Sequence, residues 1–105
     1  MSIPVSGTTT TLRVSIDGTT VTAVGEIDAQ TRHELDRALA RITLGDLDLD
    51  MTRVTFLDSS GLRSLISVHL EADSLGHRFR LIGPQRNVVR LMEVSGLAGV
   101  FTIVD

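Results

Sequence analysis

A chain of 105 residues is long enough for one domain with a real hydrophobic core and too short for two. It has no cysteine, which excludes disulfides and thiolate metal sites, and its net charge of −3, without clustered cations, does not fit a nucleic-acid-binding protein. Residues 1–10 lack the basic and apolar stretches of a secretory signal, and no apolar run approaches the ~20 residues that span a bilayer. We therefore expect a cytoplasmic protein that contacts neither membrane nor nucleic acid directly.

The N-terminal part of the sequence predicts a tail followed by a β-hairpin. Residues 1–11 are polar and rich in threonine, and we expect a flexible tail before a domain spanning residues 12–105. Apolar and polar residues alternate over Leu12–Ile16, which predicts a half-buried strand. Asp17-Gly18 is typical of a hairpin turn, and the apolar face of Val21–Ile27 predicts the returning strand.

A helix and a third strand are predicted next. Asp28 follows the second strand and is a suitable N-cap for the helix. The apolar residues of this helix have the spacing i, i+3, i+4, i+7 of one amphipathic stripe, and Gly45 ends it; they are Leu35, Ala38, Leu39 and Ile42. Strict alternation over Leu47–Met51 predicts a strand with one wet face, extended by Thr52–Leu57.

The second half of the chain predicts a helix, a strand, a helix and a strand, in that order. The first helix is indicated by an apolar stripe from Leu62 to Ala72 and ends at Gly76, and the strand by the apolar run Phe79–Ile82. The second helix is indicated by a stripe from Val88 to Met92 and ends at Ser95-Gly96, and the last strand by the run Val100–Val104.

This order of elements predicts the α/β class: a small mixed sheet made of the N-terminal hairpin plus parallel strands. Right-handed crossovers between strands in sequence order place the helices mainly on one face. The other face should then stay partly open to water. Asp48 and Asp50 support this, because a strand covered on both faces would be continuously apolar.

Phe56–Leu62 is the segment that says most about function. A strand leads into the polar elbow Asp58-Ser59-Ser60-Gly61, and a helix leaves it. Either Asp58 or Ser59 can be the N-cap of that helix. Unpaired N–H groups at a helix start favour negative charge, so an exposed serine there could carry a phosphate, adding about −1.5 to −2 charge, without unfolding the domain.

Four segments in the same order resemble the STAS family of anti-sigma factor antagonists. Phe56–Leu62 is similar to the family's central motif, and Gly25-Glu26-Ile27-Asp28 resembles its G-E-[LI]-D at the end of the second strand. Asp50 matches an aspartate that often ends the third strand, and Val94–Leu97 resembles a recurrent S-G-L after the third main helix. The resemblance covers the chain from about Leu12 to Val104.

The resemblance implies a partner switch. An unphosphorylated antagonist binds an anti-sigma factor that is also a serine kinase and so frees a sigma factor. The kinase then phosphorylates the serine after the motif aspartate, Ser59 here, which breaks the complex, and a separate serine phosphatase resets it. The implied partner-binding residues are Asp28, Asp58, Ser59, Ser60, Gly61, Leu62 and Arg63. Arg63 stands where the family often has a small residue, and its charge could pair with a phosphate on Ser59.

Other functions remain open at this stage. Some STAS domains are accessory modules of transport complexes that need no phosphorylation, and an antagonist could act on a target other than a sigma system. Asp46, Asp48 and Asp50 have the spacing of one strand face, which we interpret as a solvated face and not a cation site.

We also find no sign of catalysis, a metal or a cofactor. His33, His69 and His77 lack metal-ligand spacing, and His69 is expected to be a hydrogen-bonded helix residue. No base for activating Ser59 or Ser60 is evident, so we expect no catalytic residues, no metal and no cofactor. The chain is then a substrate of an enzyme and not an enzyme itself.

Overall fold

The computed structural model describes residues 11–105, so the predicted tail lies outside the described residues except for Thr11. The elements in chain order are β1 (Leu12–Asp17), β2 (Thr20–Ile27), α1 (Arg32–Leu39), the 3-10 helix η1 (Ala40–Leu44), β3 (Leu47–Leu57), α2 (Ser59–Leu75), β4 (Phe79–Ile82), α3 (Arg86–Val94) and β5 (Thr102–Val104).

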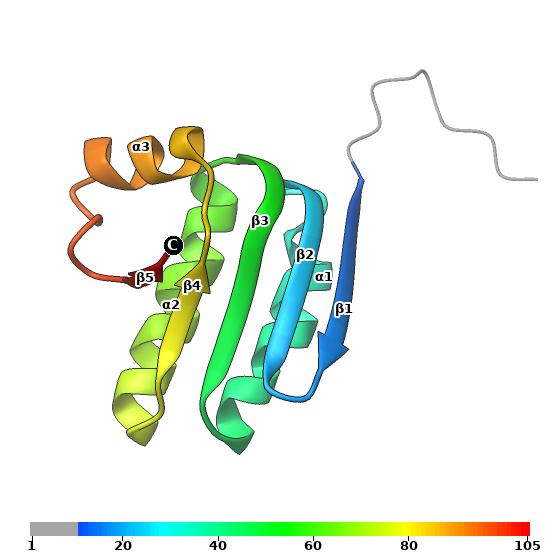
Figure 1. Ribbon diagram of the computed structural model, residues 1–105, viewed down its shortest axis with the longest axis vertical. Coiled ribbons are helices and arrows are strands. Elements are labelled where there is room, and N and C mark those ends of the chain that lie inside the picture. Colours follow the sequence, from blue (N-terminus) through cyan, green and yellow to red (C-terminus); the bar gives the residue numbers. More distant parts are fainter. Residues whose placement is uncertain (1–10) are drawn as a thin grey trace, which may run out of the picture.

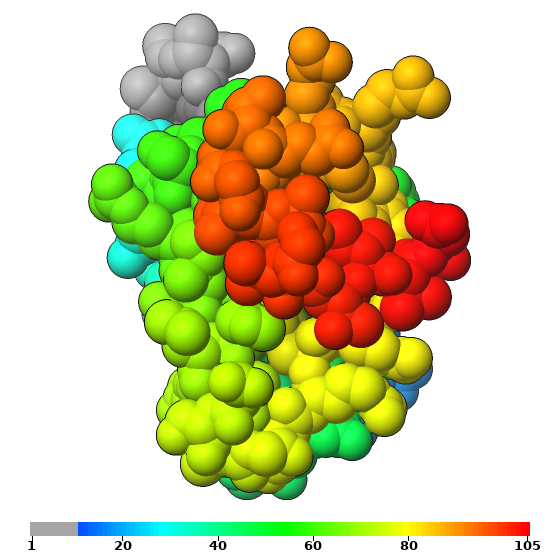
Figure 2. All heavy atoms as spheres, turned by 90° about the vertical axis from the view of Figure 1, so that its left-hand side faces the viewer, coloured from blue at the N-terminus to red at the C-terminus, as the bar shows by residue number. Residues whose placement is uncertain are grey.

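The five strands form one sheet in sequence order, with β1 antiparallel to β2 and the other pairs parallel. This confirms the predicted mixed α/β sheet. Figure 1 shows α1 and α2 together behind the sheet, while α3 lies above β4, beside the upper end of β3. Turned by 90°, the molecule shows α2, α3 and the segment leading to β5 as one continuous side (Figure 2).

The hydrophobic core lies between the sheet and the two helices behind it. Its largest fully buried side chains include Ile27, Leu35, Leu49, Leu65 and Leu81, contributed by β2, α1, β3, α2 and β4 in turn. Each comes from the apolar face that the sequence pattern predicts for its element. The core therefore holds β2, β3 and the two helices against one another.

β3 is one long strand whose register with β2 shifts at two places. The buried positions alternate from Leu47 to Met51 and then shift to Val54 and Leu57. An Asp50 carboxylate oxygen accepts hydrogen bonds from the backbone N–H and the hydroxyl of Thr52, at 2.9 and 2.7 Å. Pairing with β4 ends at Asp50, but the strand continues beside β2 to Leu57, so Asp50 does not end the third strand as the resemblance implied.

Two other element boundaries in the structure differ slightly from the predicted ones. The first helix is α-helical only to Leu39 and then tightens into the 3-10 helix before Gly45. The last strand begins at Thr102 and not at Val100. Within residues 11–105, no helix combines the length and the apolar character needed to cross a membrane.

Candidate partner-binding site at the carboxyl edge of the sheet

The ends of β2 and β3 bring two predicted site segments together. Ile27 and Leu57 are direct partners in the parallel pairing, so Asp28 and Asp58 leave the sheet side by side. The Asp58 N–H donates a hydrogen bond to the Ile27 carbonyl at 3.1 Å. Asp28 and Ser59 therefore lie at the same edge of the sheet, the edge at which ligands usually bind in α/β proteins.

Asp58, and not Ser59, is the N-cap of α2. Its backbone is extended, and its carboxylate accepts the Gly61 N–H at 3.0 Å, while its carbonyl accepts the Leu62 N–H at 2.9 Å. Ser59 is the first residue of the helix and is exposed. The capping role and the exposed hydroxyl thus belong to neighbouring residues, which leaves Ser59 accessible to another protein.

The first turn of α2 packs tightly against the strand ends through Gly61. A Cβ on this buried glycine would lie 2.5 Å from Leu57 Cδ1 and 2.7 Å from Ile27 Cγ2. Leu62 is buried as well, at 5% exposure. Both residues belong to the predicted partner-binding set. Their burial shows that they hold the turn in place, and their part in partner binding stays a prediction.

The surface of this site comes from the remaining predicted residues. Ser59 and Arg63 are exposed, while Asp28, Asp58 and Ser60 are half-buried. The result is a small polar surface at the start of α2, with two carboxylates, two hydroxyls and one guanidinium.

Asp28 shapes the turn before α1 and does not cap α1 itself, which corrects the sequence-based prediction. One carboxylate oxygen of Asp28 accepts the N–H groups of Gln30 and Thr31, at 2.9 and 3.0 Å. These bonds resemble those of an N-cap, but the regular helix begins at Arg32 with Thr31 at its N-cap. The prediction was three residues early because the chain makes a separate turn first.

Two residues that the sequence did not point to complete the site. The buried Thr31 hydroxyl donates to the Glu26 carbonyl at 2.8 Å and so ties the turn to the end of β2. Arg32 reaches from the start of α1 to the Ser60 carbonyl, with Nη1 at 3.4 Å. The Arg32 contact joins residues 28 apart in the chain, so no local pattern could have predicted it.

The three alternating aspartates bind protein groups and do not assemble into a cation site. Arg80 forms two hydrogen bonds of 2.8 Å with the Asp48 carboxylate, and these hold the pKa of Asp48 below its usual value. Asp46 accepts the Arg78 N–H at 2.7 Å, and Asp50 binds Thr52. Across residues 11–105, no group of three or more acidic, histidine or cysteine side chains is placed to hold a metal ion.

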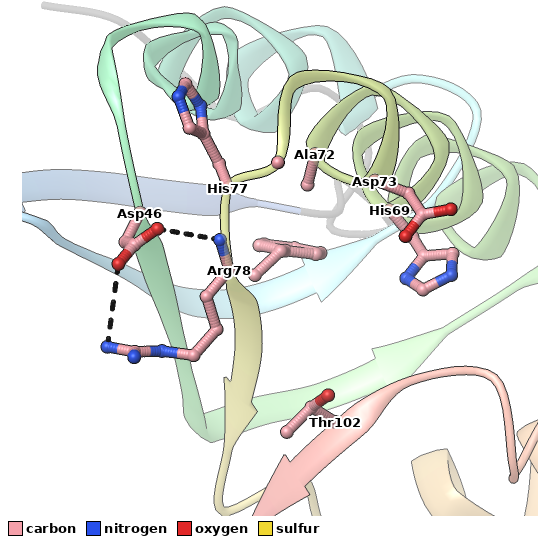
Figure 3. Close-up of a pocket in the computed structure, with 9 residues that line it drawn as sticks. Asp46, His69, Ala72, Asp73, His77, Arg78 and Thr102 are labelled. Carbon is pink, nitrogen blue, oxygen red and sulfur yellow. Dashed lines mark hydrogen bonds and ion pairs between the residues drawn. The ribbon is translucent and has the colours of Figure 1, made fainter.

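A polar cleft of about 490 Å³ lies between the end of α2 and the starts of β4 and β5, away from Ser59. Figure 3 shows His69 and Asp73 on one side of it and Asp46 with Arg78 on the other. His69 makes an edge-on contact with the Phe101 ring, with ring centroids 5.8 Å apart, and its expected hydrogen bond stays a prediction. Arg78 is paired with Asp46 on one wall, at 3.9 Å, and Asp73 lies on the other, so the cleft offers no cluster of one charge.

Comparison with known proteins decides the family. The family model described as "Mlab, STAS domain" matches residues 10–105. The chain belongs to the STAS domain family. Its STAS domain is 29% identical over 82 residues to the anti-sigma-B factor antagonists of Listeria monocytogenes and Listeria innocua, covering 75% of this chain and 72% of each relative.

Solved structures of anti-sigma factor antagonists share the fold of this STAS domain. An antagonist from Mycobacterium paratuberculosis matches with a TM-score of 0.75 and 25% identity, over 91% of this chain and 86% of that one. SpoIIAA in its unphosphorylated form matches with a TM-score of 0.70 and 20% identity, over 90% and 89% of the two chains. The phosphorylated form of SpoIIAA from Bacillus gives a TM-score of 0.65 and 19% identity, over 90% and 92%.

Proposed function

We propose that this STAS domain is a cytoplasmic anti-sigma factor antagonist that is switched off by phosphorylation of Ser59. Unphosphorylated, it binds an anti-sigma factor that is also a serine kinase, and this releases a sigma factor. Phosphorylation of Ser59 breaks the complex, and a serine phosphatase restores it. The chain acts in this cycle as a regulatory substrate and needs no cofactor.

The observation that carries the proposal is the position of Ser59. Its side chain is exposed at the first turn of a helix whose capping bonds are made by Asp58. A kinase can therefore reach the hydroxyl, and the modification breaks none of the bonds that start α2. The two forms of SpoIIAA both match this fold, which supports a modification that preserves the fold.

The effect of the phosphate then falls on the partner. We propose that the surface that binds the anti-sigma factor is formed by Asp28, Asp58, Ser59, Ser60 and Arg63. The buried residues Gly61 and Leu62 hold this surface in position. Burying a doubly charged group in such an interface is costly unless the partner supplies matching cations. We expect release by charge and steric conflict at the interface, without refolding of the domain.

The test uses three variants of the full chain. Ser59→Ala serves as bait in source-cell extract, and the recovered anti-sigma factor is purified for calorimetry and for phosphorylation with ATP. Ser59→Ala should bind and resist phosphorylation, while Ser59→Asp should keep the wild-type circular dichroism spectrum and bind at least tenfold more weakly, about 1.4 kcal/mol. Ser60→Ala is the matched control and should still be phosphorylated.

Three outcomes would contradict the proposal. These are phosphate located on Ser60 by mass spectrometry, Ser59→Asp binding as tightly as wild type, or recovery of transport proteins in place of a kinase. The last result would favour the alternative, an accessory module of a transport complex that phosphorylation does not control.

A further inference from the structure

We propose that a phosphate on Ser59 is held by an arginine clamp formed by Arg32 of α1 and Arg63 of α2. The clamp binds the phosphate to the antagonist's own surface. This inference rests on the proposed phosphorylation of Ser59 and names the residues that accommodate it.

The surroundings of Ser59 make such a clamp necessary. Asp28 and Asp58 follow the paired ends of β2 and β3, both are half-buried, and Asp58 directly precedes Ser59. A phosphate on Ser59, with about −1.5 to −2 charge, would add to the negative charge of these two carboxylates at the same edge of the sheet. The helix start cannot offset them alone, because it carries only about half a positive charge and Asp58 already binds the Gly61 N–H.

Arg63 lies in the same helix as Ser59, in a position to form an ion pair with the phosphate. It lies four residues after Ser59 and, like Ser59, is exposed, so the two residues are neighbours on one face of α2. Side chains on a helix lean toward its N-terminus, which directs the long Arg63 side chain back to the Ser59 turn.

Arg32 approaches the same turn from α1. Its present contacts are long: Nη1 lies 3.4 Å from the Ser60 carbonyl, and Nε lies 3.7 Å from the Asp36 carboxylate. The Arg32 side chain is 39% exposed, so it can move, and surface pairs of this kind stabilise little. A phosphate one residue from Ser60 offers the guanidinium shorter, charge-assisted and bidentate bonds in their place.

The clamp has a measurable consequence in the free protein. Phosphoserine ordinarily loses its second proton with a pKa of about 6, and nearby guanidinium groups favour the dianion and lower that pKa. Removing the arginines leaves the phosphate beside Asp28 and Asp58, which raise its pKa instead. The pKa of the phosphate therefore reports whether Arg32 and Arg63 contact it.

The experiment places phosphoserine at position 59 during synthesis of the full chain, so that no kinase is needed, and follows the phosphate by ³¹P NMR titration. Arg32→Gln, Arg63→Gln and the double variant are compared with wild type. Arg41→Gln is the matched control, because exposed Arg41 lines a different cleft beside Gly18 and Thr19 at the opposite end of the sheet. Circular dichroism of each variant checks that the fold is retained.

We expect the second phosphate pKa to be about 0.5 to 1 higher in the double variant than in wild type, with each single variant contributing and Arg41→Gln leaving it unchanged. A pKa that does not respond to Arg32→Gln overturns the clamp, even if Arg63→Gln raises it.

Binding of the same phosphorylated wild-type chain to the anti-sigma factor is measured separately. Undiminished affinity there would overturn the proposed switch but leave the pKa result standing, so the two failures are distinguishable.

Discussion

At the residue scale, Gly61 has a defined steric role. Its Cα lies where the first turn of α2 meets Ile27 and Leu57, and a Cβ would come within 2.7 Å of carbons in both side chains. Forcing extra volume into such a packed position typically costs about 1–3 kcal/mol. The higher helix propensity of alanine returns less than about 1 kcal/mol, so packing should decide the sign.

We therefore expect Gly61→Ala to lower the free energy of unfolding by about 1–3 kcal/mol. The measurement is urea unfolding followed by circular dichroism, because the chain has neither Trp nor Tyr. Gly99→Ala is the control: a Cβ there meets nothing within 4 Å, so its effect should stay within about 0.5 kcal/mol. Equal stability of Gly61→Ala and wild type would show that the turn can shift without cost.

The residues of the site differ in how far the sequence could predict them. The polar elbow before an apolar stripe was enough to narrow the N-cap to Asp58 or Ser59, because capping depends on neighbours in the chain. The burial of Leu62 follows from its place in the predicted apolar stripe. The contacts of Arg32 depend on where α1 meets α2, and the close packing of Gly61 depends on how the first turn of α2 meets the ends of β2 and β3. Both are set by tertiary packing, which a single sequence encodes only indirectly.

At the element scale, α2 depends on its buried stripe. The sequence predicts that Leu65 or Ile66 is deeply buried, and the structure assigns this role to Leu65, which is fully buried, while Ile66 packs at the margin of the core. We expect Leu65→Ala to cost about 2–5 kcal/mol, the sum of lost burial and the cavity left behind.

The matched control for α2 is Leu70→Ala in the same helix, since Leu70 is 61% exposed. Its cost should be within about 0.5 kcal/mol. Both variants are measured by urea unfolding with circular dichroism. Equal effects of the two substitutions would mean that the inward face of α2 is assigned incorrectly.

The elements also show where a periodic pattern stops being informative. Alternation over Leu47–Met51 predicted that part of β3 well, because each residue faces either the core or the open side. Beyond it, β3 gains one extra residue against β2 at two places, between Asp50 and Arg53 and between Val54 and Phe56, so Val54 and Leu57 become the buried positions. The end of α1 behaves similarly, since a 3-10 turn keeps Ile42 buried at a slightly different angle and mimics a longer α-helix.

At the scale of the whole molecule, the order of strands follows from a general rule and not from any one residue. Right-handed crossovers between neighbouring parallel strands place successive helices on the same side, as α1 and α2 show (Figure 1). That arrangement leaves the opposite face of the sheet to polar pairs such as Asp48 and Arg80. It also collects the ends of β2 and β3 at one edge, where Ser59 is presented.

The stability of the molecule should respond to acid through the Asp48–Arg80 pair that bridges β3 and β4. Hydrogen bonds from Arg80 hold the pKa of Asp48 below its usual value in the folded protein, although partial burial opposes this. A carboxyl whose pKa is lower when folded stabilises the protein above its unfolded pKa, near 4, and this stabilisation is lost as the pH falls through the lower folded pKa. The pair should therefore contribute fully at pH 6–7 and not at all in strong acid.

We expect Asp48→Asn to be less stable than wild type at pH 7, with a difference that shrinks below about pH 4 and disappears once wild-type Asp48 is protonated. The measurement is the free energy of unfolding in urea, followed by circular dichroism at a series of pH values. Asp105→Asn, at an exposed residue after β5, controls for the loss of one negative charge. A difference between Asp48→Asn and wild type that stays constant from pH 7 into strong acid would mean that the amide disturbs the packing of β3 and β4, and that the ion pair does not stabilise the fold.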